Sequence, residues 1–409
     1  MANKPRIRFR GFTEDWEQRK LESLFTKYED KVNTPDSGYW RLGLRSHCKG
    51  TFHTYVDAGH ELETTEMYRV KAGNFILNIT FAWERALAVT DDEDQDKLVS
   101  HRFPQFKPNS DLVIDFFKHT LMDKRLKHHL ELSSPGGAGR NKVLKVSDML
   151  KYELLVPSIQ EQNIISSFLN NIDHIITLHQ CKLKKLNLAK KSLLQKLFPR
   201  NGSQIPGVRF KGFTDAWEQR KLNDFGIATG GTSIESEFVD GGTYKVINIG
   251  SYSEESVYND QGLRVNKTDK TKSRILNKYD LTMILNDKTA SGNIIGRVLL
   301  IDQDNTYVYN QRTERIEVDT KNFLPMFLYH MLNAPEQRKY IVKASQGNTQ
   351  IYVNWSTISN IDYMIPQLLL EQEKIANLFS LINKDITLHQ RKLDCLISIK
   401  KGLLQQLFV

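Results

Sequence analysis

The chain has 409 residues, and its 57 Lys and Arg outnumber its 48 Asp and Glu, so the formal net charge is +9 at pH 7. With 40% hydrophobic and 26% charged residues, it has enough apolar side chains for roughly two or three packed domains and lacks the composition of a disordered chain. No apolar run reaches the roughly 18 residues of a membrane span, and we predict no secretory signal behind the basic first residues. Three separated cysteines (Cys48, Cys181, Cys395) exclude a disulfide framework and a cysteine zinc site, so we expect a cytoplasmic protein.

Hydrophobic patterns along the chain predict a mixed α/β (α+β) protein. In the first body, β-branched and aromatic runs predict strands at residues 75–81 and 87–90, then a helix at residues 118–130 and a Gly-rich turn at residues 134–140. In the second body, strands are expected at residues 244–249, 281–285, 294–301 and 315–318. Helices at residues 323–334 and 335–344 and a turn at residues 345–350 follow. A long helix is expected after each body.

Two segments of the chain occur twice. Residues 8–21 read RFRGFTEDWEQRKL, residues 209–222 read RFKGFTDAWEQRKL, and 11 of the 14 positions are identical. Residues 161–198 recur as residues 371–408 with 19 of 38 positions identical, including the run ITLHQ. The bodies between these segments show no comparable similarity. The chain is therefore a duplicated framework with two dissimilar bodies, which suggests one architecture that reads two different things.

The second repeated segment has the pattern of a coiled-coil helix. Apolar residues recur at alternating steps of four and three in both copies, which is the a/d spacing of a heptad seam. Each copy follows a proline, Pro157 or Pro366, and 38 residues make a helix about 57 Å long. We expect the two helices to pair as an antiparallel coil, whose seam contains Ile176, His179, Leu183, Leu186, Ile386, His389, Leu393 and Leu396. A seam histidine can set the register or hydrogen-bond a neighbour, and no ligand spacing favours a metal there.

The sequence contains none of the common catalytic motifs. It has no P-loop, no G-x-G-x-x-G before a helix, no G-x-S-x-G, no H-E-x-x-H and no zinc-deaminase signature. The Asn-Pro-Pro-Tyr type of motif, which holds an extruded adenine in methyltransferases, is absent as well. A nuclease-like trace of Glu317, Asp319 and Lys321 is better interpreted as a solvated strand end. We therefore predict a binding protein without a catalytic centre.

The motifs, taken in order and in duplicate, resemble the DNA-specificity subunit of type I restriction–modification systems. The resemblance rests on the paired RF-x-GF…W-E-x-x-x-L motifs, the P…EQ helix starts, and the ITLHQ-x-KL and K-K-x-L-L-Q-x-L-F runs of both helices. The segments Tyr309, Asn310, Gln311 and 347–350 of the second body also match. The first body departs from the pattern, because it has Trp83 and residues 100–106 (SHRFPQF) in place of the Tyr-Asn-Gln triplet. Its DNA contacts are therefore harder to place.

The resemblance implies two target recognition domains, residues 1–155 and 201–364, each reading one half of a split site in double-stranded DNA. It implies that the helices at residues 156–200 and 365–409 are conserved spacers, which dock two modification (adenine methyltransferase) subunits that restriction (ATP-dependent translocase and nuclease) subunits then join. This chain would hold no cofactor, because S-adenosylmethionine, ATP and Mg²⁺ would belong to those partners. The setting would be phage defence in a bacterium or archaeon. Dissimilar bodies predict an asymmetric site, with half-site centres about one helical turn, ~34 Å, apart.

Candidate DNA contacts are polar and basic residues on predicted loops. Arg matches guanine, and Asn or Gln matches adenine, through bidentate hydrogen bonds. The candidates are Arg41, Arg45, His47, Lys49, Arg140 and Asn141 in the first body, and Lys288, Asn293, Gln311, Arg312, Asn348, Thr349 and Gln350 in the second. As an alternative, the loop residues satisfy their own turn, and the Tyr-Asn-Gln triplet belongs to a buried core.

Two other functions stay open from sequence alone. A self-contained nuclease or methyltransferase would need a catalytic motif that the sequence lacks. A coiled-coil scaffold without DNA specificity accounts for the long helices but not for two large dissimilar bodies. Trp16 and Trp217 are identical in the two copies, so we expect them to anchor each body to the helices and not to carry specificity.

Overall fold

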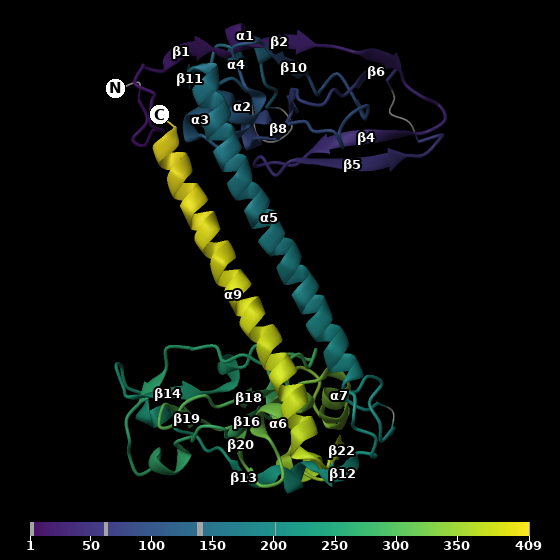
Figure 1. Cartoon of the computed structure of the whole chain (residues 1–409), viewed down its shortest axis with the longest axis vertical. Coiled ribbons are helices and arrows are strands. Elements are labelled where there is room, and N and C mark those ends of the chain that lie inside the picture. The colour runs from purple at the N-terminus through teal and green to yellow at the C-terminus, as the bar shows by residue number, and fades with distance from the viewer. Residues whose placement is uncertain (1–3, 61–63, 137–141, 201, 409) are drawn as a thin grey trace. The chain divides into compact units, whose positions relative to one another are not determined.

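The computed structural model describes residues 4–60, 64–136, 142–200 and 202–408 and divides the chain into two compact units. The first unit combines residues 1–179 with residues 392–409, and the second comprises residues 180–391. Each unit contains one variable body and a part of both long helices, α5 (Ile159–Lys196) and α9 (Leu369–Leu407) (Figure 1). The predicted mixture of strands with two long helices is confirmed.

Within its described residues, the first unit contains three sheets. Strand β1 (Glu17–Lys20) pairs with β11 (Glu153–Val156), a second sheet has the order β2-β10-β7-β8, and a third has the order β3-β6-β9-β4-β5. The strands of the larger sheets are β2 (Phe25–Tyr28), β3 (Lys31–Asn33), β4 (Tyr39–Leu44), β5 (Thr51–Val56), β6 (Glu66–Arg69), β7 (Phe75–Leu77), β8 (Leu87–Val89), β9 (Leu98–Val99) and β10 (Gln105–Pro108). Its short helices are α1 (Leu21–Leu24), η1 (Ala82–Glu84), α2 (Ile114–Thr120), α3 (Lys124–Leu132) and α4 (Val146–Met149). Strands β4 and β5 form a hairpin at the edge of the unit away from α5 (Figure 1).

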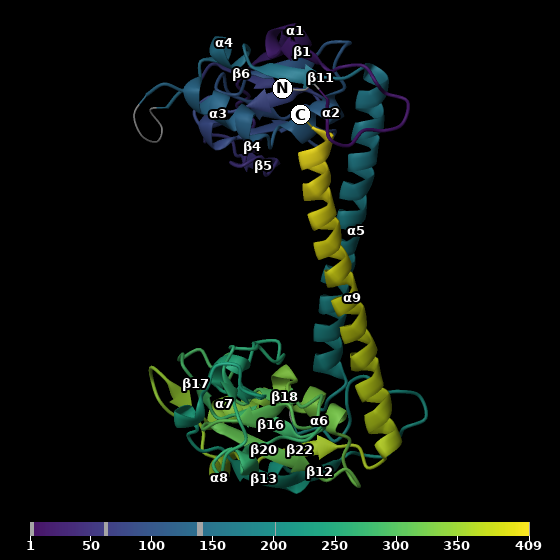
Figure 2. The same ribbon diagram turned by 90° about the vertical axis from the view of Figure 1, so that its left-hand side faces the viewer.

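The second unit follows a similar plan. Strand β12 (Glu218–Lys221) pairs with β22 (Asp362–Ile365), and the other sheets have the orders β13-β20-β16-β18, β15-β14-β19 and β17-β21. Their strands are β13 (Gly226–Gly230), β14 (Tyr244–Ile247), β15 (Arg264–Val265), β16 (Leu281–Ile284), β17 (Asn286–Asp287), β18 (Val298–Leu300), β19 (Tyr307–Tyr309), β20 (Thr313–Val318) and β21 (Ile351–Tyr352). The helices are η3 (Leu222–Phe225), η4 (Glu235–Glu237), η5 (Ile249–Ser251), η6 (Lys272–Arg274), α6 (Pro325–Leu332), α7 (Pro335–Ala344) and α8 (Trp355–Ile358). Helix α6 lies between the four-stranded sheet and α9 (Figure 2).

The repeated sequence motifs fold into matching structures. Strand β1 pairs antiparallel with β11 from Glu17 opposite Val156, and β12 pairs with β22 from Glu218 opposite Ile365. Both units also contain a four-stranded sheet of corresponding order, formed by β2-β10-β7-β8 in one and β13-β20-β16-β18 in the other. The expectation that the two dissimilar bodies share a common fold therefore agrees with the sheet topology.

A pair of buried charges joins each opening motif to its long helix. The Arg8 guanidinium donates from Nε and Nη2 to the two carboxylate oxygens of Glu161, at 2.7 Å each. In the second unit, Arg209 donates to Glu371 in the same way at 2.7 and 2.8 Å. Such two-pronged contacts fix orientation as well as distance. They explain why the first and last repeated segments occur together in each half.

Both hydrophobic cores are completed by the long helices. In the first unit, Trp16 packs with Ile165 and Leu169 of α5 and with Leu407 of α9. In the second, Trp217 packs with Leu197, which directly follows α5, and with residues of α9 that include Phe379. The predicted anchoring role of both tryptophans is therefore confirmed. The Asp173 carboxylate of α5 also accepts from Lys400 of α9 at 2.5 Å, so the helices pair antiparallel within the first unit.

Some predicted elements are wrong or shorter than expected. The single helix expected at residues 118–130 is two helices, α2 and α3, because Asp123 caps a new helix by accepting from the Arg125 backbone N–H. The strand expected at residues 294–301 begins only at Val298, after Gly296 adopts a φ of 70°. The basic segment at residues 41–49 is not simply a loop, because Arg41 lies on β4. The predicted Gly-rich turn extends into residues 137–141, which lie outside the described residues.

Candidate nucleic-acid interface

In the first unit, the candidate residues lie on the β4–β5 hairpin. Arg41 is half-buried on β4, and Arg45, His47 and Lys49 are exposed beyond it. The Arg45 guanidinium lies over the Phe52 ring at 5.2 Å and donates to the Thr51 carbonyl. The hairpin therefore presents three exposed groups that can reach a phosphate or a base edge.

The turn of this hairpin is fixed against helix η1. The His47 and Cys48 backbone N–H groups donate to the carbonyls of Glu84 and Arg85 at 2.8 and 2.9 Å. Both residues have a positive φ, 64° and 53°, a conformation that non-glycine residues rarely adopt without such support. Burial raises the pKa of the Cys48 thiol to about 11, so this cysteine stays protonated and is no nucleophile.

Helix η1 also approaches the second candidate loop of the first unit. The Lys142 ammonium lies 5.1 Å from the centre of the Trp83 ring. The candidates Arg140 and Asn141 directly precede Lys142 but lie outside the described residues. Sequence reasoning noted Trp83 only as a departure from the family pattern. Trp83 therefore contacts Lys142 from the same short helix whose end holds the hairpin turn.

In the second unit, three separate segments with candidate residues converge. Strand β17 pairs with β21, so the loops at residues 286–293 and 345–350 lie side by side. The Leu285 backbone N–H donates to the Arg312 carbonyl at 2.8 Å, and Leu285 accepts from the Val353 N–H at 2.9 Å. This brings together the exposed candidates Lys288, Asn293, Gln311, Arg312, Asn348, Thr349 and Gln350. Exposed groups on neighbouring loops are the arrangement that direct reading of base edges requires.

The Tyr-Asn-Gln segment divides between core and surface. Tyr309 and Asn310 are buried, as the core interpretation predicts, whereas Gln311 is exposed. The Asn310 Oδ1 accepts from the Ile234 backbone N–H at 3.1 Å, and Asn310 and Gln311 each donate to Glu235 Oε1 at 3.0 Å. Asn310 is therefore a structural residue. Gln311 would have to leave Glu235 before its amide could bind a base.

Two further arginines hold these loops. Arg338 of α7 donates from Nη2 to the carbonyls of Gly292, Asn293 and Ile295 at 2.8 to 3.1 Å. Burial lowers the pKa of Arg338 to about 10. Arg274 lies over the Tyr309 ring at 5.3 Å and donates to its hydroxyl at 3.0 Å. Each contact joins distant segments, so no local sequence pattern could have revealed it.

Glu314 of β20 is a buried carboxyl beside these loops. Burial raises the pKa of Glu314 to about 7 from its ordinary value of 4.5, and the charge of Arg274 opposes this shift. The folded chain then binds more protons at Glu314 than the unfolded chain between these two values. The contribution of Glu314 to stability therefore falls as the pH rises from about 4.5 to about 7 and levels off above that.

Replacing Glu314 with glutamine is expected to remove that part of the pH dependence. The variant should be more stable than the wild type at pH 8, by about 1–3 kcal/mol, because no buried charge forms. Urea unfolding at pH 5, 6, 7 and 8 measures the difference. The exposed Glu317→Gln, on the same strand, is the matched control. An equal pH slope in wild type and Glu314→Gln would contradict the assignment.

The seam residues of the long helices are partly covered. Leu183 and Leu393 are buried, and the remaining predicted seam residues are half-buried, namely Ile176, His179, Leu186, Ile386, His389 and Leu396. In the first unit, Ile176 packs against the core that also contains Leu403 and Leu404 of α9.

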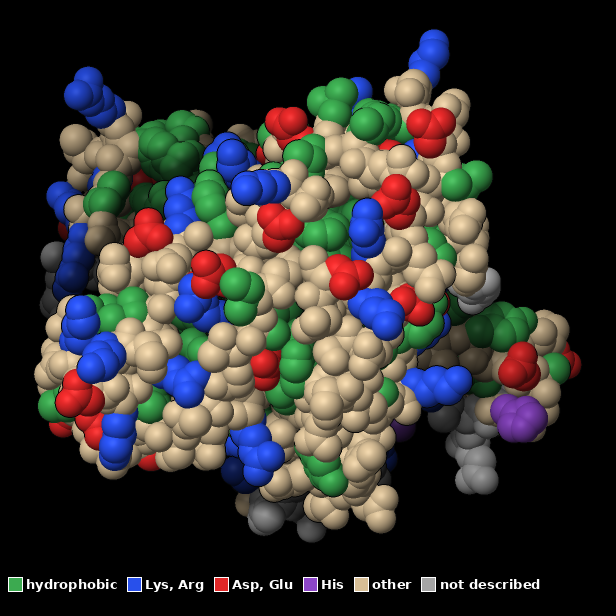
Figure 3. All heavy atoms as spheres, turned by 90° about the horizontal axis from the view of Figure 1, so that it is seen from below, with side chains coloured by type: hydrophobic (Ala, Val, Ile, Leu, Met, Phe, Trp, Pro, Cys, Tyr) green, Lys and Arg blue, Asp and Glu red, His purple; other side chains and the backbone are tan. Residues whose placement is uncertain are grey.

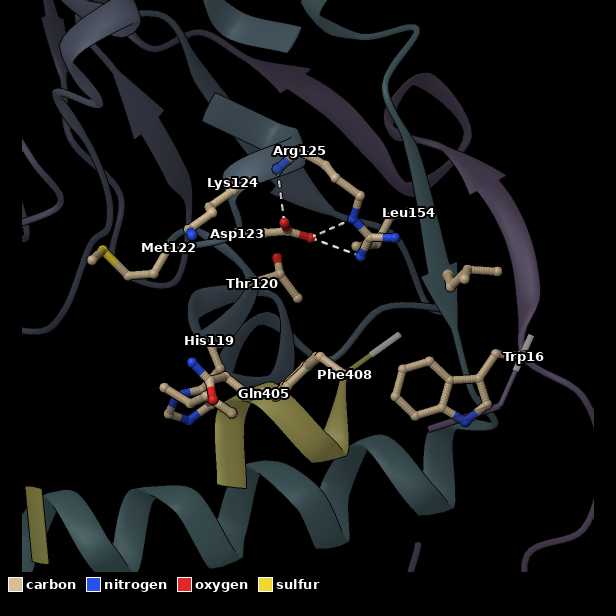
Figure 4. A pocket seen from close by; sticks show the side chains of 12 residues that line it. Trp16, His119, Thr120, Met122, Asp123, Lys124, Arg125, Leu154, Gln405 and Phe408 are labelled. Carbon is tan, nitrogen blue, oxygen red and sulfur yellow. Dashed lines mark hydrogen bonds and ion pairs between the residues drawn. The ribbon is translucent and has the colours of Figure 1, made fainter. Parts of the chain in front are cut away.

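A cavity of about 430 Å³ lies where the end of α9 meets α2 and α3 (Figure 4). Asp123 and Arg125 lie along one wall, and Trp16 and Phe408 lie along another (Figure 4). The Asp123 carboxylate is committed to capping α3 and to the Arg125 guanidinium, at 2.8 Å. Asp123 is the one carboxylate among the described residues that line this cavity, and it is held in these structural contacts.

Charge alone does not mark a DNA-binding face. On the face seen in Figure 3, Lys and Arg side chains are interspersed with Asp and Glu. Within the described residues, no group of three His, Cys, Asp or Glu is placed to hold a metal ion. The Asp319 carboxylate accepts from the Lys321 N–H at 3.1 Å and from Asn322 at 2.7 Å, as expected for a strand end. Across the described ranges, every helix is too short or too polar to cross a membrane.

Comparison with known proteins identifies the framework. The family model of the type I restriction modification DNA specificity domain matches the chain twice, at residues 13–188 and 214–396. These two matches cover most of the chain. The chain belongs to this family. Its two specificity domains are the two variable bodies with their attached helix segments.

Individual relatives agree with the family. The specificity subunit of the type I restriction enzyme MjaVIII from Methanocaldococcus jannaschii is 26% identical over 293 residues, which cover 69% of this chain and 67% of the relative. The crystal structure of a type I restriction–modification S subunit from M. genitalium has a TM-score of 0.59 at 12% identity, with 99% of each chain covered. A chain from a structural study of complex assembly and conformational transition in the type I system has a TM-score of 0.52 at 13% identity, with 96% and 97% covered. The specificity domains thus share their fold with distant relatives.

Proposed function

We propose that this chain is the DNA-recognition subunit of a type I restriction–modification complex and that its two specificity domains read the two different halves of a split DNA site. The observation that carries the proposal is the family match to both halves of a chain whose frameworks agree and whose loops differ. The matching strand pairs and buried Arg–Glu contacts orient each body in the same way. Different loops on the same framework would read different bases.

We propose that the reading groups of the second domain are the converged loop residues. Asn348 and Gln350 are exposed beside Asn293 and Arg312, and amides and guanidinium groups form the bidentate contacts that distinguish adenine and guanine. Lys288 and Thr349 would contact phosphates and fix the position of the loops. In the first domain, Arg45, His47 and Lys49 at the end of the β4–β5 hairpin would have the corresponding roles, with Arg41, Arg140 and Asn141 beside them.

We further propose that the chain catalyses no reaction itself. The cavity beside Asp123 and the strand end at Asp319 have their carboxylates committed to structural hydrogen bonds. Methyl transfer with S-adenosylmethionine and ATP-dependent cleavage with Mg²⁺ would then belong to two modification subunits and to restriction subunits docked on α5 and α9. The complex would act on DNA in the cytoplasm of its bacterial or archaeal host. A purified chain that methylates or cleaves DNA unaided would contradict this part of the proposal.

Replacing Asn348 and Gln350 together with alanine is expected to change only one half of the recognised site. Each lost bidentate contact should cost about 1–3 kcal/mol of discrimination at its own base pair, and the other half-site should stay unchanged. Mapping methylated adenines in host DNA, with the wild-type gene, without it and with the variant, measures both half-sites at once. Lys343→Ala, which changes an exposed side chain on α7 close to the same loop, is the control. A uniform loss of binding to all sequences would show that these residues do not read bases.

A further inference from the structure

The two units differ in one polar cluster where α2 or α6 meets the long helices. In the first unit, His119 contacts the Asn170 Oδ1 at 3.2 Å, and the Asn170 amide donates to Asp115 at 3.0 Å. Beside them, the Lys400 ammonium donates to Asp173 at 2.5 Å. Each cation and amide in this cluster therefore has a partner supplied by the chain.

The cluster has an equivalent in the second unit, because equivalent hydrogen bonds join the same elements. The Val113 N–H donates to Gln162 in the first unit and the Leu324 N–H to Gln372 in the second, both at 2.8 Å. This correspondence pairs His119 with His330, Lys400 with Lys190, Asn170 with Ser380, Asp115 with Met326 and Asp173 with Asn383. Both carboxylates are thus replaced by neutral side chains, while the histidine and the lysine remain.

The replacements leave two groups of the second unit without their partners. His330 is 3% exposed, and its Nε2 has no hydrogen-bond partner, since Ser380 is shorter than Asn170. Lys190 is half-buried and forms no ion pair within the described ranges. Burial lowers the pKa of Lys190, and the negative charge of Glu255 opposes this shift. A buried charge without a partner costs free energy, so an external anion would be stabilising here.

A cavity of about 390 Å³ gives an anion access to His330. Lys384 and Arg391 add two positive charges to its wall, and no lining residue has a carboxylate. The lining residues are Met326, Tyr329, His330, Ser380, Asn383, Lys384, Thr387, Leu388 and Arg391. Lys190 does not line the cavity, but its positive charge acts on His330, which does. Asn383 lines the cavity at the position where Asp173 binds the equivalent lysine. A carboxylate entering beside Asn383 would take the place of that missing group.

We propose that this cavity receives the carboxylate of an Asp or Glu side chain from a partner protein and that its equivalent in the first unit, already occupied by Asp173, does not. The surroundings favour a protein over a DNA phosphate. Leu388 and Leu381 of α9 are 49% and 62% exposed beside the cavity, and apolar residues with Arg are typical of protein interfaces. A side-chain carboxylate on a flexible stem can also reach buried His330, whereas a duplex phosphate is flanked by its sugars. The identity of the partner, a modification subunit, rests on the proposed function.

The first experiment tests the cavity in the chain alone, with acetate as the probe. The unfolding temperature of the second unit is compared in sodium acetate and sodium chloride at equal ionic strength. We expect a rise of about 2 °C in acetate for the wild type, because binding to the folded state stabilises it. Asn383→Asp supplies the internal carboxylate and should abolish the rise, while its own unfolding temperature in chloride increases. Asp173→Asn is the matched variant, and it should gain a rise in the first unit.

The second experiment measures assembly with the modification subunit of the same system. Asn383→Asp should weaken its binding about tenfold, and Asp173→Asn should not weaken it. An equal acetate response in the wild type and Asn383→Asp would overturn the cavity as an anion site. Normal assembly of Asn383→Asp, or weaker binding to duplex DNA without the partner, would overturn the partner carboxylate as its occupant. If the wild type fails to assemble, the proposed function is contradicted, and the acetate response alone decides whether the cavity takes a carboxylate.

Discussion

Replacing Glu371 with alanine is expected to lower the free energy of unfolding of the second unit by about 3–5 kcal/mol. The Glu371 side chain is 2% exposed and accepts hydrogen bonds from Nε and Nη2 of Arg209. It also accepts a hydrogen bond from the Trp217 indole N–H at 3.3 Å. Its removal leaves the Arg209 guanidinium without its counter-ion at a site with little access to water. Hydrogen exchange measured by mass spectrometry follows the loss, because it reports protection in each unit separately.

Two controls make the Glu371 result specific. Glu373→Ala removes an exposed carboxylate two residues along the same helix and should change stability by less than about 0.5 kcal/mol. Glu161→Ala should repeat the Glu371 effect in the first unit, because Arg8 forms the same contact there. If Glu371→Ala and Glu373→Ala are equally mild, the Arg–Glu pair does not hold the body to the helix.

Replacing Leu407 with alanine is expected to destabilise the first unit by about 2–5 kcal/mol and to leave the second unit unchanged. Leu407 is buried in a core with Trp16 and Phe116, and the Phe408 ring next to it lies 5.3 Å from that of Phe116. The truncation therefore leaves a cavity under the N-terminal body, although the residue lies near the end of the chain. Peptides from α2 should lose protection against hydrogen exchange, while peptides from α6 should not.

Ile397→Ala is the matched control for Leu407, because it truncates an exposed apolar residue of the same helix. Leu197→Ala is the converse variant, since Leu197 is buried in the core of the second unit. The two leucines occupy equivalent positions of the repeat, so their effects should be similar in size and should appear in opposite units. Loss of protection in both units from Leu407→Ala would contradict the separation of the two cores.

The sequence predicted the framework because the framework is periodic and duplicated. The four-and-three steps along α5 and α9 define each helix over 38 or 39 residues, and packing of one apolar stripe suffices to fix them. The buried roles of Trp16 and Trp217 followed from their identity in the two copies. Several strands of the second body, such as β14 and β16, were also predicted, since their apolar runs are short and bounded by turn residues.

The candidate site was predicted less completely, because its shape depends on contacts between distant segments. The neighbouring loops of the second unit are joined by β17 and β21, each only two residues long and without any recognisable pattern. Arg338 donates hydrogen bonds to carbonyl groups of residues 292–295, and Arg274 packs over the Tyr309 ring, so both contact segments far away in sequence. The break between α2 and α3 rests on one capping aspartate, which an amphipathic pattern does not reveal. The roles of the individual reading residues stay predictions.

The composition of the first unit from two ends of the chain has a consequence for biosynthesis. Residues 180–391 emerge from the ribosome as one uninterrupted segment, so the second unit has its whole core before translation ends. The first unit must wait for Leu403, Leu404, Leu407 and Phe408, which follow the segment 180–391 and complete its core. The segment 180–391 is made between the two segments of the first unit, which takes roughly 10–40 s at about 5–20 residues per second. The body made first is thus finished last, and a chain truncated before Leu403 would have a complete core in the second unit and an incomplete core in the first.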